Sequence, residues 1–269
     1  RVGAVLAKNS DYTRYYIDYK SGDLTISGIM NVPIGEGPWP VLVLNHGYID
    51  PVIYTNCRGL KREQDYFARR GYVVIHPDYR NHANSTKDET VEVNFRLGYI
   101  EDVINLVLAV KESDLGYFDK ENIGMLGHSV GGGVTMGVMV VRPDLVQAVS
   151  LYAPVSAEIR DNFDKWTRVR EDVSDEILTK YGLPESGSKF WDNLSPRNFF
   201  DRVENPVILH HGTLDKDVPI DWSEKLVEWI DESDIENSYY VYPGGPHEFI
   251  KDWPLFMQRN VEFFDEHLK

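Results

Sequence analysis

The sequence has 269 residues, of which 42% are hydrophobic and 26% are charged, and its formal net charge is −15 at pH 7. A chain of this size and composition can bury a full core, so we expect one soluble globular domain over residues 1–269. The acidic balance excludes a nucleic-acid partner, because binding phosphates requires a basic surface. No apolar run reaches the roughly 18 residues that a membrane span needs.

Two features bear on the cellular compartment. Cys57 is the one cysteine, so no internal disulfide is expected, which fits a reducing compartment and also many exported enzymes. The sequence starts at Arg1 rather than at methionine, so we expect a trimmed start or a removed signal segment. The prediction is a protein that is either cytoplasmic or exported with a removed N-terminal segment.

Strand-like and helix-like segments alternate along the chain. Residues 15–19 and 24–30 are predicted to form an antiparallel hairpin. Further strands are predicted from short apolar runs at 41–44, 73–75, 123–126, 148–151, 207–209 and 239–242. Helical patterns lie between them at 103–110, 131–141, 226–230 and 256–264. The order predicts an α/β fold with a mostly parallel central sheet, an N-terminal antiparallel hairpin and helices on both faces.

One interval is longer than the others. About fifty residues separate the strand that ends near Ala153 from the strand that starts near Pro206, which is long for a structureless loop in a compact domain. Residues 164–170 and 175–181 have helical patterns. We therefore expect residues 155–204 to form a small helical insert before the penultimate strand, above the C-terminal edge of the sheet. A peripheral excursion without a function is the alternative.

The motif Gly127-His128-Ser129-Val130-Gly131 lies between an apolar strand and a helical stretch. A G-x-S-x-G match alone is weak, but a strand-to-helix turn is the context in which this motif exposes a nucleophilic serine. The small residues at 127 and 131 let the turn close, and the start of the helix favours negative charge. Ser129 is therefore the predicted nucleophile, and a glycine-rich turn that only packs is the alternative.

A nucleophilic serine needs a base, and the base needs an acid that orients it. His247 lies in a loop of glycines and prolines after the last predicted strand, and it is the predicted base. Asp215 and Asp217 compete for the acid. Asp215 comes first after the strand end and is preferred, which leaves Asp217 to stabilise the loop or to cap the next helix. His210 and His211 end the preceding strand, and at least one of them is expected to be structural.

The oxyanion of an acyl-transfer reaction needs two backbone N–H donors. One is predicted at Val130, directly after the nucleophile, and the other at Tyr48, in the loop Asn45-His46-Gly47-Tyr48 that follows the 41–44 strand. His46 is expected to fix this loop rather than to act as an acid or base.

These motifs resemble the α/β-hydrolase superfamily, and within it the prolyl-oligopeptidase-like hydrolases and related carboxylesterases. The resemblance covers residues from about 25 to 269 and rests on motifs in the expected order: His46-Gly47, Asp78-Tyr79-Arg80, Gly127-His128-Ser129-Val130-Gly131-Gly132, His211-Gly212-Thr213-Leu214-Asp215 and His247. It implies the α/β-hydrolase fold with Ser129, Asp215 and His247 as the triad. The residue before the nucleophile, His128, is more usual in esterases and lipases.

The first hypothesis is a carboxylesterase that cleaves esters through an acyl-enzyme intermediate. The alternative is an aminopeptidase or oligopeptidase with the same triad, acting on a short peptide. An aminopeptidase would use paired acids to recognise an α-amine, and the insert offers several: Glu158, Asp161, Asp164, Glu171 and Asp172. A catalytically silent binding protein on the same fold is disfavoured, because all three triad residues are present.

No metal or cofactor is expected. Asp215-Lys216-Asp217 lacks the remaining spacing of a calcium loop, and the adjacent His210 and His211 have no further zinc-ligand pattern near them. No G-x-G-x-x-G follows a strand, so no nucleotide signature is present. The sequence does not assign substrate-binding residues.

Overall fold

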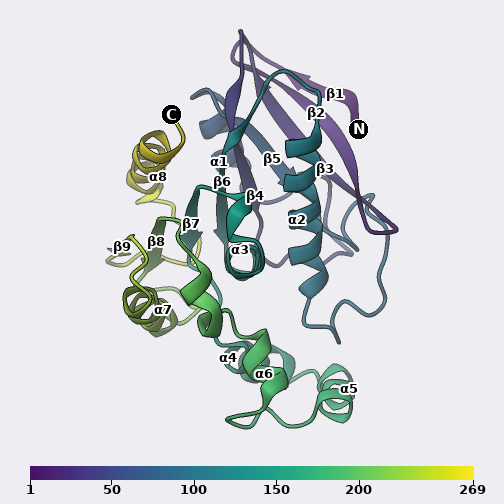
Figure 1. Cartoon of the computed structure of the whole chain (residues 1–269), viewed down its shortest axis with the longest axis vertical. Coiled ribbons are helices and arrows are strands. Elements are labelled where there is room, and N and C mark those ends of the chain that lie inside the picture. The colour runs from purple at the N-terminus through teal and green to yellow at the C-terminus, as the bar shows by residue number, and fades with distance from the viewer.

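The computed structural model describes all 269 residues, which form one nine-stranded sheet with helices on both faces (Figure 1). The strands are β1 (Val2–Lys8), β2 (Tyr12–Ser21), β3 (Leu24–Pro33), β4 (Trp39–Asn45), β5 (Val73–Pro77), β6 (Phe118–His128), β7 (Ala148–Tyr152), β8 (Val207–Gly212) and β9 (Asn237–Tyr242). The helices are α1 (Lys61–Ala68), α2 (Leu97–Glu112), α3 (Val130–Val141), α4 (Ile159–Asn162), α5 (Glu171–Tyr181), α6 (Lys189–Leu194), α7 (Ile220–Glu232) and α8 (Trp253–Leu268). None of them combines the length and the apolar character that crossing a bilayer requires.

The strand order is β1-β2-β3-β5-β4-β6-β7-β8-β9. The pairs from β1 to β5 are antiparallel, and all pairs from β5–β4 to β8–β9 are parallel. The predicted α/β-hydrolase fold, with its mostly parallel sheet and N-terminal antiparallel hairpin, is confirmed. The hairpin strands are longer than predicted, and β1 was not predicted. β1 lies at the sheet edge with nearly all its residues exposed, so it lacks the alternating pattern of a half-buried strand.

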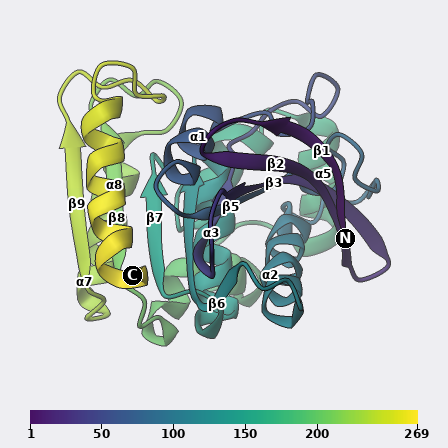
Figure 2. The ribbon, with the colours of Figure 1, turned by 90° about the horizontal axis from the view of Figure 1, so that it is seen from above.

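Both faces of the sheet are covered. In β4, Val41 and Val43 face a core shared with α2, α3 and α7, whereas Leu42 and Leu44 face a second core shared with α1 and α8. Figure 2 shows α8 lying along one face of the sheet. Helix α1 was not predicted. Its buried positions include Glu63 and Gln64 in addition to apolar residues, so its sequence has no simple apolar stripe.

The chain between β7 and β8 forms a separate lobe at the bottom of Figure 1, which contains α4, α5 and α6. Its small core includes Phe163, Ile177 and Trp191, together with Val93 from the main body. The helical stretch predicted at 164–170 was misplaced. Glu158 caps the chain by accepting the Arg160 N–H, so α4 begins earlier, and it continues into a π-helical turn over Phe163–Thr167.

The loops after β4, β6, β8 and β9 leave the same edge of the sheet, because parallel strands place their carboxyl ends together. Between β6 and α3 the chain turns sharply at Ser129. The start of α3 packs directly on the end of β4: a Cβ on Gly131 would lie 2.0 Å from the Asn45 carbonyl oxygen. The absence of a side chain at residue 131 is thus a condition for placing the turn at this edge.

We expect Gly131→Ala to lower the free energy of unfolding by about 3 kcal/mol or more, because backbone atoms cannot move aside for the added methyl group. Urea denaturation of the purified variant measures this loss. Gly116→Ala is the matched control, because a Cβ at that exposed loop position meets nothing within 4 Å. Equal stability of the two variants would contradict the packing described here.

Several histidines are buried in the folded protein. Burial lowers the pKa of His46, His76 and His128 to about 3. In the unfolded chain these groups titrate near pH 6.5. Below that pH the unfolded chain therefore binds protons that the folded protein does not, so stability is complete above about pH 6.5 and falls as the pH drops towards 3.

Each of these histidines should cost about 2 kcal/mol of stability at pH 5 relative to pH 7, so the urea midpoint should fall steeply over this interval. Neither ring nitrogen of His76 has a hydrogen-bond partner. His76→Phe should therefore reduce the pH dependence of the unfolding free energy by about one proton. An unchanged slope in this variant would show that His76 titrates normally in the folded protein.

Candidate active site

The loops after β8 and β9 bring two of the predicted residues into contact. His247 Nδ1 donates to Asp215 Oδ2 over 2.7 Å. Asp217 makes no hydrogen bond to His247. Its backbone N–H donates to Asp215 Oδ1 over 2.9 Å, and its side chain does not cap α7. Of the two competing carboxylates, the histidine thus contacts the one that comes first after the strand.

Asp215 accepts three hydrogen bonds, and its side chain is fully buried. Besides His247 and the Asp217 N–H, the donor is the Val218 N–H at 2.9 Å, and His211 Nε2 lies 3.1 Å from Asp215 Oδ2. Burial acts to raise the pKa of Asp215, but the neighbouring N–H groups of His211, His247 and Val218 hold that pKa below its ordinary value. The carboxylate is therefore ionised, and the proton of His247 resides on Nδ1.

The role of His211 was not identified from the sequence. Its Nε2 also faces the Val218 carbonyl oxygen at 3.1 Å, and its Nδ1 lies 2.7 Å from Ser223 Oγ. A carbonyl only accepts, so the Nε2–H donates and Nδ1 accepts from the Ser223 hydroxyl. The Nε2–H is thus bonded to the Val218 carbonyl and at the same time lies beside Asp215 Oδ2, so its partial positive charge faces the carboxylate. The only sequence signal is the spacing of four residues between them, which is not diagnostic.

His210, the neighbouring histidine, points elsewhere. Its ring nitrogens lie near the Tyr242 hydroxyl and the Asn260 amide, away from the Asp215 carboxylate. The expectation that at least one histidine of this pair is structural thus describes His210.

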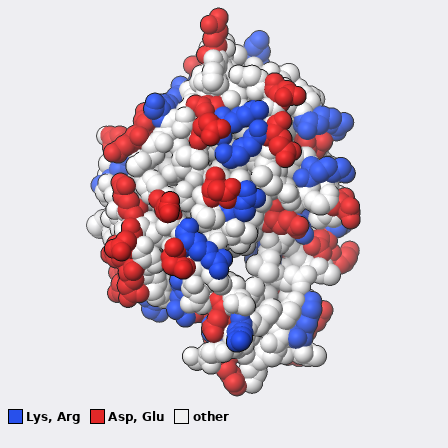
Figure 3. Space-filling view, in the orientation of Figure 1, with Lys and Arg blue, Asp and Glu red and all other residues white.

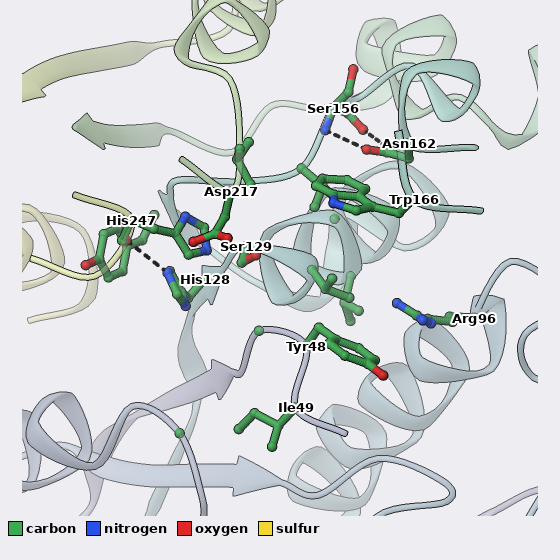
Figure 4. A pocket seen from close by; sticks show the side chains of 18 of the residues that line it. Tyr48, Ile49, Arg96, His128, Ser129, Ser156, Asn162, Trp166, Asp217 and His247 are labelled. Atoms are coloured by element: carbon green, nitrogen blue, oxygen red, sulfur yellow. Dashed lines mark hydrogen bonds between the residues drawn. The ribbon is translucent and has the colours of Figure 1, made fainter. Parts of the chain in front are cut away.

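Ser129 has backbone angles of φ 55° and ψ −119° at the start of α3. This conformation is strained for a residue with a side chain. Two backbone hydrogen bonds to β7 and to the loop that follows β7 hold this conformation. The Ser129 N–H donates to the Tyr152 carbonyl over 3.0 Å, and the Val155 N–H donates to the Ser129 carbonyl over 3.1 Å. Figure 4 shows Ser129 and His247 next to each other at one end of a pocket.

His128 supports the position of His247. Its Nε2 donates to the His247 carbonyl oxygen over 3.2 Å, and the two ring centroids lie 4.6 Å apart. Burial, followed by the neighbouring His247, lowers the pKa of His128 to about 3, so this ring is neutral. It holds the backbone of the His247 loop without adding charge beside the imidazole.

The predicted oxyanion donors flank Ser129. Neither the Tyr48 N–H nor the Val130 N–H forms a hydrogen bond with a loop carbonyl or with a side chain. Both N–H groups are therefore available to an oxygen of a bound substrate. The loop that carries Tyr48 lies against the serine, because a Cβ on Gly47 would lie 3.1 Å from Ser129 Cβ. Four of the five predicted site residues, Tyr48, Ser129, Val130 and His247, thus line the pocket, and the fifth, Asp215, contacts His247.

Ser129 and His247 line a cavity of about 940 Å³. Many of its walls are hydrophobic, and both the main body and the lobe contribute to it. Figure 4 shows side chains from both parts: Tyr48, Ile49 and Arg96 from the main body, and Ser156, Asn162 and Trp166 from the lobe. These are candidate substrate contacts that the sequence did not assign.

The donor set at Asp215 also bears on metal binding. Ligand atoms of Asp215, Asp217 and His247 lie within 4.8 Å of one another. The Asp215 side chain is fully buried, however, and three hydrogen bonds already occupy its oxygens. A carboxylate in this state is a hydrogen-bond acceptor that orients an imidazole rather than a ligand open to a cation.

Comparison with known proteins identifies the family. Residues 58–269 match the prolyl oligopeptidase family. The chain is similar to the acylamino-acid-releasing enzyme of Arabidopsis thaliana, with 26% identity over 83% of this chain and 30% of that protein. It spans about a third or less of the length of the curated relatives it matches.

Solved structures share the fold. The acylaminoacyl peptidase of Pyrococcus horikoshii superposes with a TM-score of 0.77 at 21% identity, over 97% of this chain and 42% of that chain. Acetyl xylan esterase 1 from Thermoanaerobacterium sp. superposes with a TM-score of 0.73 at 19% identity, over 99% of this chain and 87% of that chain. The family match over most of the sequence and the shared fold agree: the chain belongs to the prolyl oligopeptidase family of α/β-hydrolases.

Proposed function

We propose that the protein is a serine hydrolase that cleaves carboxylic esters through an acyl-enzyme intermediate. Ser129 is the nucleophile, His247 the general base and Asp215 the acid that orients it. The observation that carries the proposal is the 2.7 Å contact between His247 Nδ1 and Asp215 Oδ2 beside a serine in a strained turn. Nucleophile, base and orienting carboxylate in this arrangement are the requirements of acyl transfer.

The protonation states fit this role. With its proton on Nδ1, His247 has Nε2 free to take the Ser129 proton as the hydroxyl attacks the ester carbonyl. The N–H groups of Tyr48 and Val130 then stabilise the oxyanion. His247 returns the proton to the leaving alcohol, and a water molecule releases the acid by the reverse steps.

Peptide cleavage by the same triad is the second candidate, and the peptidase names of relatives such as the acylamino-acid-releasing enzyme favour it. Recognition of a free α-amine has less support. None of the five insert acids considered for that role lines the cavity. Glu158 is paired with two arginines and Asp164 with one, and Asp161 accepts from the Ser156 hydroxyl. The ester hypothesis requires no such acid.

Ser129→Ala should lower ester turnover by about 10⁴-fold or more, because the members of a triad act as a unit. The test is a rate panel of p-nitrophenyl acetate, butyrate and octanoate, methyl ferulate and aminoacyl-p-nitroanilides. Asp215→Asn should also cost about 10⁴-fold, since it leaves the wrong histidine tautomer. Asp217→Asn is the matched control and should retain nearly full activity. Anilide turnover comparable to ester turnover would establish a peptidase instead.

His211 is proposed as a positioning residue. His211→Phe removes the 3.1 Å contact of an imidazole N–H with Asp215 and should lower kcat by about 10- to 100-fold with little change in KM, because Asp215 and His247 are then held less firmly. His211→Gln keeps a donor and should recover part of the loss. His210→Phe is the control for burying a ring at this strand end. A loss that is equal in the two phenylalanine variants would mean that the effect is structural only.

A further inference from the structure

The cavity wall beyond Tyr48 carries two arginines and one glutamate. Arg96 Nε and Nη2 donate to the two oxygens of Glu92 over 2.8 and 2.9 Å, and Arg170 Nη1 donates to Glu92 Oε2 over 2.6 Å. Burial acts to raise the pKa of Glu92, but hydrogen bonds from Arg96 and Arg170 hold it below its ordinary value. These three residues, the Arg96–Arg170 cluster, thus have one positive charge in excess.

Both guanidinium groups keep N–H donors that no protein atom accepts. Arg96 leaves Nη1 without a partner, and Arg170 uses only Nη1. The two side chains are 23% and 40% exposed and line the cavity. A guanidinium presents its donors in a planar fork that matches the two oxygens of a carboxylate. The cluster can therefore bind a carboxylate at this part of the cavity wall.

Arg96 is held in place at some cost. Phe95 and Arg96 both have left-handed backbone angles, with φ of 55° and 57°, which is uncommon for residues with side chains. The Arg96 guanidinium also stands 4.9 Å from the Tyr48 ring. Figure 4 shows Arg96 directed into the pocket towards Tyr48. Gly47, the neighbour of Tyr48, is packed so closely on Ser129 that an added Cβ would lie 3.1 Å from Ser129 Cβ. The Arg96 guanidinium therefore lies on the far side of the Tyr48 side chain from the serine.

The rest of the protein makes this excess unusual. The chain carries a net charge of −15, and Figure 3 shows acidic side chains spread over the face in view, with basic ones between them. The other charged residues that line the cavity are Lys61, Arg62, Glu63, Asp217 and Glu248. Their formal charges sum to −1, so the positive charge in the cavity lining is local to the Arg96–Arg170 cluster.

We propose that the Arg96–Arg170 cluster is a subsite for a carboxylate carried by the substrate, so that the preferred ester bears a negative charge several bonds from the scissile carbonyl. The inference rests on the proposed function, since Ser129 must be the reacting group. It predicts that a charged acyl or alcohol chain reaches across Tyr48 to Arg96 and Arg170.

The test compares the mono-4-nitrophenyl ester of adipic acid with 4-nitrophenyl hexanoate, which has the same chain length without the charge. Adipate avoids the cyclic anhydrides through which shorter half-esters decompose. A second pair, 3-carboxyphenyl butyrate and phenyl butyrate, places the charge on the alcohol side. We expect kcat/KM to favour the charged member of one pair by about tenfold at low salt, and the preference to shrink as salt is added.

Three variants separate an anion site from a structural clamp. Arg170→Gln should abolish the preference while leaving hexanoate turnover within about twofold. Glu92→Gln removes the negative charge and should increase the preference, whereas loss of a clamp would lower both rates together. Arg168→Gln is the matched control, because Arg168 pairs with Asp164 and lies outside the cavity lining. It should change nothing.

Binding to the Ser129→Ala protein, measured by calorimetry with the same esters, provides a readout without turnover. Tighter binding of a charged ester that is lost in the double variant Ser129→Ala/Arg170→Gln would support the subsite. This holds even if the wild-type protein hydrolyses neither member of a pair, since the absence of hydrolysis would contradict only the proposed function. Equal binding and equal rates of charged and neutral members in both pairs would overturn the subsite while leaving the esterase proposal intact.

Discussion

The left-handed backbone of Ser129 is the constraint on which the rest of this structure depends. Such a conformation costs about 1–3 kcal/mol and persists only where its surroundings enforce it. The two strands that flank β6 do so. At the end of β4, Asn45 packs closely against Gly131, and at the end of β7 the Tyr152 carbonyl accepts a hydrogen bond from the Ser129 N–H. The strand order is therefore what makes the strained turn at Ser129 possible.

The charge states of the site residues are also set by the groups around them. The imidazole of His128 is kept neutral by burial, while the buried Asp215 carboxylate stays ionised because three hydrogen-bond donors and the nearby His211 replace the water it has lost. The Asp215–His247 pair and the arginines around Glu92 are thus two separate charged groups, the first at the reacting serine and the second farther along the cavity wall. A substrate that lies between them meets mostly apolar and aromatic surface.

Much of this could be predicted from sequence because the informative patterns are local. Strands buried on both faces appear as apolar runs, and the glycines around Ser129 report the sharp turn directly. What could not be predicted depends on tertiary contact. Helix α1 buries Glu63 and so shows no apolar stripe, His211 acquires its role only when the chain turns back at Val218, and no pattern announces the left-handed angles at Arg96.

The lobe and the main body share one aromatic cluster. Phe95, the neighbour of Arg96, stands 5.2 Å from Trp191 and 6.0 Å from Tyr181, ring centroid to ring centroid. Swinging the lobe away would expose the part of the Phe95 ring that these contacts cover, at a cost of about 25 cal/mol for each Å² of apolar surface uncovered. The lobe is therefore held against the main body next to Arg96, and any motion that drew it away would first have to break these ring contacts.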